Sequence, residues 1–126
     1  MLSHRDRVAA EDMLVAARRA VEYALSVSPV EFATDRMRVD ATMATLMIVG
    51  EASKRVSPDG RRALPGVDWR ELSDIRQYVV HKYFLVDPTE LHRAVAESLP
   101  ELVGTLEPLL TRGAERIPPG GGGLSL

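Results

Sequence analysis

The chain has 126 residues, of which 45% are apolar and 27% are charged, and its formal net charge is −2. These values are typical of one soluble globular domain. They exclude a protein that attracts nucleic acid through its overall charge, so an RNA contact would require a basic patch that is local or shared between subunits. The chain has no cysteine and no apolar run of about 18 residues, which excludes disulfides, thiol catalysis and a membrane span, so we expect a cytoplasmic protein.

Two helices are predicted in the first half of the chain. The first covers residues 3–26, where Ser3 and Asp6 resemble a capping pair and MLSHRDRVAAED lacks the features of a signal peptide. After a link at residues 28–35, the second runs from about residue 36 to 56. Glycine inside a helix costs about 1 kcal/mol relative to alanine, so we expect Gly50 to permit close packing of a neighbouring helix, with Glu51 beside it. The apolar stripes of the two helices are Ala9, Met13, Ala16, Ala20 and Ala24, and Val39, Met43, Leu46, Met47 and Gly50.

Two more helices are predicted after a loop at residues 57–66. Asp68 is a good N-cap for a third helix, which begins at Trp69 and contains RQYVVHKY (76–83). Asp87 and Pro88 cap a fourth helix, which Pro100 should kink or split. The apolar face of this last segment consists of Leu91, Ala94, Val95, Leu99, Leu102, Leu106, Leu109 and Leu110.

These elements predict an all-α protein, folded as an antiparallel bundle of four to five helices. We expect the domain to cover residues 1–112. Residues 113–126 contain IPPGGGGLSL, which cannot bury a core and is predicted to be a disordered tail.

Within the third helix, Arg76, His81 and Tyr83 form the pattern R-x4-H-x-Y. At about 100° per residue, Tyr83 lies nearly on the stripe of Arg76, whereas His81 lies about 140° away. A straight helix therefore does not bring the arginine and the histidine to one face. Three arrangements would: a break in the helix, the long reach of arginine, or a second copy across a two-fold axis, which duplicates every group.

The chemistry of this trio suits RNA cleavage. Histidine titrates near neutral pH and can take a proton from a ribose 2′-OH or give one to a leaving 5′-oxygen, while arginine stabilises charge at phosphorus. This attack needs no metal, and the three histidines, at positions 4, 81 and 92, lie too far apart in sequence to indicate a metal site. Alternatively, the spacing arises by chance and the tyrosine only packs its ring and hydrogen-bonds its hydroxyl.

The surrounding segments, IVGEASKRVS (48–57) and LPGVDWRELSDIRQYVVHKYFLVDPTELHRAVAESLPEL (64–102), resemble the HepT-like branch of the HEPN superfamily. The resemblance covers about residues 5–110 and rests on four features in a fixed order. These are a Gly-Glu pair, a P-x-x-x-W stretch, the R-x4-H-x-Y motif and a Val-Asp pair that opens the next helix. In this chain they are Gly50-Glu51, Pro65 with Trp69, Arg76/His81/Tyr83 and Val86-Asp87.

The resemblance implies a HEPN-like homodimer in which two copies of the motif meet at a cleft. It also implies a metal-independent endoribonuclease toxin of a type VII-like toxin–antitoxin system, without a cofactor. Its partner would be a minimal nucleotidyltransferase (MNT) antitoxin that transfers AMP to the motif tyrosine. Arg76 and His81 would be the catalytic pair and Tyr83 the modified residue, where AMP adds negative charge and bulk that repel RNA.

Three further residues are candidates for RNA binding or for support of the site. Lys82 lies within the motif, and Gln77 occupies a position where relatives often carry asparagine. Glu51 either orients a basic group at an interface or pairs with a basic neighbour in its own helix, Lys54 or Arg55. Gln77 also favours an alternative function, a non-catalytic helical subunit that scaffolds a nucleotidyltransferase.

The remaining candidates have structural interpretations. His92, where relatives often carry tryptophan, is expected at a surface or interface rather than in catalysis, and Trp69 is expected to anchor packing. The other cations of this region are interleaved with acidic residues, so we expect a solvated surface. They are Lys54, Arg55, Arg61, Arg62 and Arg70.

Overall fold

The computed structural model describes residues 2–114, which form six α-helices and one 3-10 turn and contain no strand. Four helices are long: α1 (His4–Leu25), α3 (Arg36–Lys54), α5 (Trp69–Lys82) and α6 (Pro88–Ala114). Two are short, α2 (Pro29–Thr34) and α4 (Pro58–Arg62), and the turn η1 (Tyr83–Leu85) follows α5. The predicted all-α fold class is therefore confirmed.

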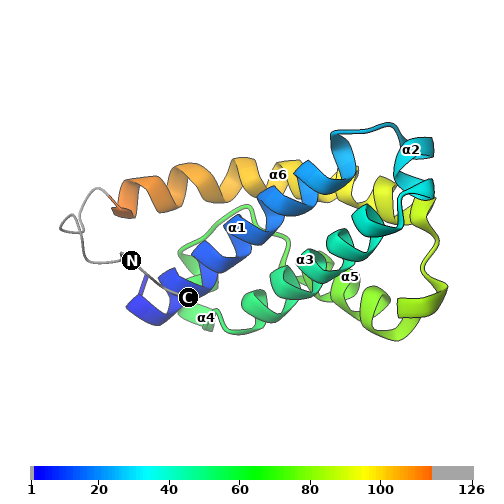
Figure 1. Ribbon diagram of the computed structural model, residues 1–126. Coiled ribbons are helices and arrows are strands. Elements are labelled where there is room, and N and C mark those ends of the chain that lie inside the picture. The colour runs from blue at the N-terminus through cyan, green and yellow to red at the C-terminus, as the bar shows by residue number, and fades with distance from the viewer. Residues whose placement is uncertain (1, 115–126) are drawn as a thin grey trace.

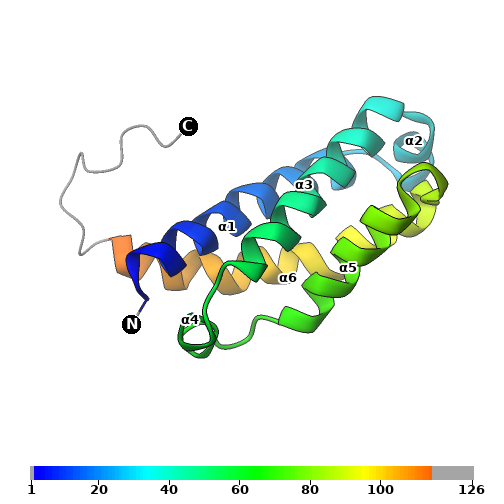
Figure 2. The same cartoon turned by 90° about the horizontal axis from the view of Figure 1, so that it is seen from below.

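The long helices run side by side as a bundle (Figure 1). Helix α1 packs against both α3 and α6, and α5 packs against α3. Helices α3 and α5 run in opposite directions, and α2 and α4 lie at opposite ends of the bundle (Figure 2). This arrangement places η1, which carries Tyr83, at the end of the molecule where α2 lies.

The core consists largely of the predicted apolar stripes. In α1 all five predicted positions are buried, and most are alanines, whose small side chains permit the close approach of α3. In α6 the buried positions recur every three or four residues, which keeps one face against α1 and α2. They are Leu91, Val95, Leu99, Leu102, Leu106 and Leu110.

Short helices replace the link and the loop that the sequence predicted at residues 28–35 and 57–66. Both begin with Ser-Pro: the hydroxyl of Ser28 accepts a hydrogen bond from the N–H of Glu31, and that of Ser57 from the N–H of Gly60. Proline fits the first turn of a helix because the N–H that it lacks would have no partner there. The prediction of irregular structure was wrong, because a serine cap followed by proline starts a helix even where few residues follow.

The predicted split at Pro100 was also wrong, because α6 continues through Pro100 and Pro108 as one helix. Both prolines are exposed, on the opposite side of the helix from the leucine stripe that packs on the core. Each removes one backbone hydrogen bond, and the buried stripe on both sides of Pro100 keeps the helix continuous.

The predicted boundary at residue 112 stays a prediction. Helix α6 extends to Ala114, and residues 115–126, most of the expected tail, lie outside the described residues. Among residues 2–114, no helix combines the length and the hydropathy that a bilayer span requires.

Candidate functional site

Helix α5 runs without interruption from Trp69 to Lys82 and carries Arg76 and His81, whereas Tyr83 begins η1. This rules out a helix break between Arg76 and His81 as the means of bringing them together. Within residues 2–114, no hydrogen bond or ion pair joins the two side chains. Each is instead held by a different neighbour, so one protomer presents the two groups separately.

Arg76 faces α3, where it lies over Gly50 and pairs with Glu51. Its Nε donates a hydrogen bond to Oε1 of Glu51, and Nη2 forms an ion pair with the same carboxylate. The Arg76 side chain is 21% exposed and that of Glu51 is 54% exposed. A guanidinium has five N–H groups, so this pairing leaves donors for a phosphate. Gly50 has the predicted role, because its missing side chain makes room for Arg76.

Glu51 therefore contacts the motif rather than the basic residues of its own helix. Arg55 pairs instead with Asp12 of α1, with Nη2 2.9 Å from Oδ2. Of the two roles considered for Glu51, the geometry fits the orientation of a basic group and not a pairing within the helix. The sequence spacing favoured the local pairs because it contains no information on which helix packs against α3.

His81 and Gln77 lie one turn apart on an exposed face of α5. The ring Nε2 of His81 is 2.8 Å from Oε1 of Gln77. Lys82 follows in the chain and is also exposed. The imidazole is thus accessible to solvent on one side and hydrogen-bonded on the other.

Tyr83 begins a run of exposed apolar residues at the end of the motif. Its ring is 42% exposed and meets Phe84 edge to face, with centroids 5.2 Å apart. Phe84 is 91% exposed, and the neighbouring Leu85 and Val80 are exposed too. Tyr83 is therefore accessible, and this end of the protein presents an apolar surface to water.

Tyr78, which the sequence interpretation missed, anchors this segment. Its hydroxyl accepts a hydrogen bond from the N–H of Asp87 and donates one to Glu90, both at 3.3 Å. Burial of the ring, assisted by the carboxylates of Glu90 and Asp87, raises the pKa of Tyr78. Tyr78 thereby ties α5 to the start of α6 across η1. Tyr78 lies three residues after the partly buried Ile75, which indicates that its ring packs but does not reveal a hydroxyl contact.

The other basic residues are largely engaged in surface contacts. Arg61 stacks over Trp69, with Cζ 5.0 Å from the ring centroid, and Arg62 pairs with Asp59. Trp69 is half-buried against the core, as expected of a packing anchor. His92, expected at a surface or interface, is half-buried within the protomer, with its ring 5.4 Å from that of Phe32.

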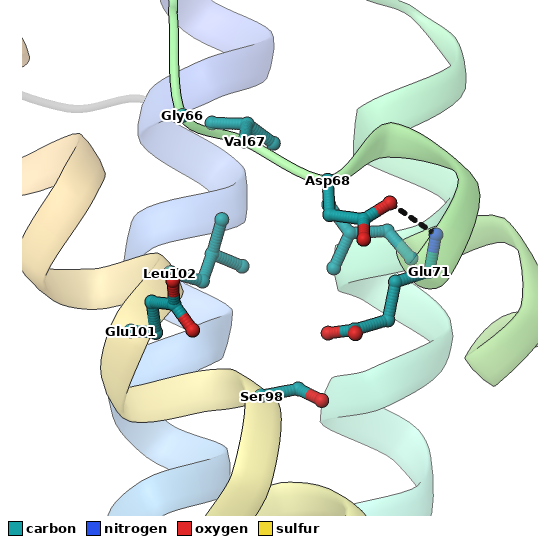
Figure 3. A pocket seen from close by; sticks show the side chains of 8 residues that line it. Gly66, Val67, Asp68, Glu71, Ser98, Glu101 and Leu102 are labelled. Carbon is teal, nitrogen blue, oxygen red and sulfur yellow. Dashed lines mark hydrogen bonds between the residues drawn. The ribbon is translucent and has the colours of Figure 1, made fainter.

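A small pocket lies at the start of α5, at the opposite end of this helix from His81. The loop at residues 66–68 and helix α6 complete its wall, which contains the carboxylates of Asp68, Glu71 and Glu101 (Figure 3). Asp68 also caps α5 by accepting a hydrogen bond from the N–H of Glu71. These carboxylates carry negative charge and repel the phosphates of RNA, so this pocket does not suit the expected substrate.

Comparison with known proteins identifies the family. A sequence model described as "Ribonuclease HepT-like" matches residues 13–109. The chain belongs to the ribonuclease HepT-like family. It is 35% identical over 107 residues to "Probable ribonuclease HepT" from Thermococcus cleftensis, covering 85% of this chain and 96% of that protein. It is also 32% identical over 96 residues to "Putative RNase MJ1380" from Methanocaldococcus jannaschii, covering 76% and 88%. No solved structure matched significantly.

The match to the HepT-like family, at residues 13–109, begins within α1, ends within α6 and includes the whole motif. It confirms the resemblance drawn from the sequence and the expected enzyme class, an endoribonuclease. The roles of individual residues, the homodimer and the antitoxin partner are proposals.

Proposed function

We propose that this HepT-like protein is a metal-independent endoribonuclease toxin that cleaves RNA as a homodimer. One observation carries the proposal: Arg76 and His81 project from different faces of an unbroken helix, each held by its own neighbour. A two-fold axis beside α5 supplies a second copy of each group, so that the arginine of one protomer faces the histidine of the other.

The apolar surface at the end of the motif supports this association. Phe84 and Leu85 are 91% and 79% exposed, next to Tyr83 and Val80, and Ile48 is exposed on the adjoining helix α3. Burial of one large apolar side chain stabilises a complex by roughly 1.5–3 kcal/mol. A second copy seated on this surface would cover Phe84 and Leu85 and bring the two motifs together.

The proposed reaction is an attack of the ribose 2′-oxygen on the adjacent phosphorus. His81 takes the 2′-OH proton, the new 2′-O–P bond forms and the P–O5′ bond breaks. Arg76 stabilises the negative charge that develops on the phosphoryl oxygens, and the departing 5′-oxygen takes a proton from water. The products are a 2′,3′-cyclic phosphate and a 5′-hydroxyl end. Lys82, within the motif, adds positive charge.

We also propose that an MNT-type nucleotidyltransferase silences the toxin by transferring AMP to Tyr83. The exposure of Tyr83, which lies two residues after His81, supports this step. The hydroxyl oxygen attacks the α-phosphorus of ATP, pyrophosphate leaves, and the hydroxyl proton passes to solvent. The added phosphate would repel RNA near His81 and would disturb the apolar dimer surface. Intact mass after co-expression with such a partner tests this step: one adenylyl group is expected on the wild type and none on Tyr83→Phe.

Cleavage of a labelled RNA in the presence of EDTA tests the main proposal. We expect the wild-type protein to cut the RNA, and His81→Ala to lose activity by roughly 100-fold or more while it keeps its helical content and melting temperature. A wild-type protein that cuts no RNA, yet binds a nucleotidyltransferase equally well with or without His81, would favour the alternative, a non-catalytic scaffold.

A further inference from the structure

We infer that Gln77 is a positioning residue that fixes the tautomer of His81, so that Nδ1 is the ring nitrogen that takes the proton from RNA. The assignment of the tautomer rests on the geometry of the free protein. Its consequence for catalysis rests on the proposed function. Gln77 lies one helical turn before His81, and its Oε1 is 2.8 Å from Nε2 of the ring.

The donor and acceptor roles follow from the atoms that meet. An amide oxygen has no hydrogen, so it can only accept, and the nitrogen that faces it must carry the proton. The contact therefore selects the form of neutral His81 with hydrogen on Nε2. In that form Nδ1 has a free lone pair, and Nδ1 is the nitrogen available to act as a base.

The length of the glutamine side chain makes this contact possible. Side chains four residues apart lie above one another on a helix, and their ends must bridge about one turn. Asparagine is shorter by one methylene. The glutamine at position 77 therefore has enough reach to touch the imidazole of its own helix.

Proton transfer leaves this contact intact. When Nδ1 takes the 2′-OH proton, the ring becomes an imidazolium with hydrogen on both nitrogens. The Nε2–H bond to Gln77 stays in place and becomes charge-assisted, which strengthens it. The ring then need not turn between the neutral and the protonated state, and the orientation of Nδ1 toward the substrate is preserved.

Two substitutions separate this role from a general surface contact. Gln77→Met keeps the length of the side chain but removes the acceptor. Gln77→Glu keeps an oxygen at the same reach but removes the amide N–H groups. If Gln77 acts through its oxygen, the glutamate variant retains the tautomer and the methionine variant loses it. Ser73→Ala, one turn earlier on the same face of α5, serves as the control.

The tautomer is measured first, on the RNA-free protein with 15N-labelled histidine, by NMR of the ring nitrogens at a pH where His81 is neutral. We expect the wild type, Gln77→Glu and Ser73→Ala to carry hydrogen on Nε2 alone, and Gln77→Met to give a mixture. A wild-type ring with hydrogen on Nδ1, or a methionine variant with the same spectrum as the wild type, would overturn the inference. RNA cleavage plays no part in this measurement, so its outcome stands whether or not the protein is a ribonuclease.

The catalytic consequence is measured by steady-state cleavage. We expect Gln77→Met to lower kcat about tenfold with KM unchanged, a fraction of the roughly 100- to 10,000-fold that a general base contributes. Gln77→Glu should recover most of kcat but raise KM, because its charge repels phosphate. A loss in Gln77→Glu as large as that in Gln77→Met would assign the role to the amide N–H groups and would contradict the proposal.

Discussion

The backbone of Gly50 lies directly against the side chain of Arg76. A Cβ at position 50 would come within 2.8 Å of Cγ and Cδ of Arg76, and closer still to its Cβ. Because the Cβ of Arg76 is fixed by helix α5, α3 and α5 would have to separate to accept any larger residue. The close packing that the sequence predicts at Gly50 is therefore a contact with Arg76, the arginine of the motif.

We predict that Gly50→Ala lowers both stability and activity. Forced separation of packed helices costs about 1–3 kcal/mol, against a gain in helix propensity of about 1 kcal/mol. The expected net loss is up to about 2 kcal/mol in urea unfolding at fixed protein concentration, with a drop in RNA cleavage as Arg76 moves. Gly104→Ala in α6 is the matched control, because a Cβ there meets nothing within 4 Å. It should stabilise the protein by about 0.5–1 kcal/mol. Equal effects of the two substitutions would contradict the close approach.

The ion pair between Glu51 and Arg76 should matter more for activity than for stability. We predict that Glu51→Ala lowers kcat/KM by about tenfold, because Arg76 loses the partner that orients it. The free energy of unfolding should change by less than about 1 kcal/mol, since half of the Glu51 side chain is exposed. Asp12→Ala breaks a similarly exposed ion pair, with Arg55, and should leave cleavage unchanged. Full activity in Glu51→Ala would show that Arg76 needs no such support.

The exposed end of the motif should govern association. We predict that Phe84→Asp weakens the dimer at least about 30-fold, which corresponds to about 2 kcal/mol of lost apolar burial. Sedimentation over a range of concentrations measures this change. Val8→Asp places the same charge at an exposed position near the start of α1, at the other end of the molecule, and should leave the dimer intact. If both variants dimerise with equal affinity, the dimer interface does not include η1.

Acid should destabilise the protein through Asp6, which joins the start of α1 to α4. Its carboxylate accepts hydrogen bonds from the N–H of Ser57 at 2.8 Å and from its hydroxyl at 2.6 Å, and these bonds lower the pKa of Asp6. A carboxyl whose pKa is lower in the folded than in the unfolded protein stabilises the fold above its unfolded pKa. That stabilisation disappears as pH falls through the folded pKa.

The corresponding experiment is urea unfolding of the wild type and of Asp6→Asn between about pH 6 and pH 2. The variant should be less stable near pH 6, and the difference between the two proteins should shrink as pH falls. Asp40→Asn, at an exposed position of α3, should change neither the stability nor its dependence on pH. A difference between wild type and Asp6→Asn that stays constant with pH would show that the charge of Asp6 has no role.

Much of the fold follows from periodicity and caps. The predicted apolar positions are buried, all five of them in α1 and most of them in α3 and α6. Apolar residues that recur about every 3.6 positions lie on one face of a helix, and that face packs against the core. Asp68 caps α5 as predicted, because its carboxylate accepts a hydrogen bond from an N–H in the first turn that has no partner within the helix. The short helices α2 and α4 were missed because five or six residues show no period, although Ser28-Pro29 and Ser57-Pro58 mark their starts.

The site was harder to predict than the fold. The spacing of Arg76 and His81 correctly indicates that they occupy different faces, because the helix stays straight between them. The partner of Glu51 required knowledge of which helix packs on Gly50, and the contact of Tyr78 with Asp87 and Glu90 depends on how the chain turns at η1. Both are tertiary contacts, which sequence spacing within one helix does not encode.

Complementation between two inactive variants tests the composite site most directly. Arg76→Ala and His81→Ala, carrying different affinity tags, are co-expressed, and the mixed dimer is purified through both tags. If the arginine of one protomer acts with the histidine of the other, one of the two sites in the mixed dimer is intact, and cleavage should return to about half of the wild-type rate. A mixed dimer as inactive as either variant alone, beside an active wild type, would contradict the shared site.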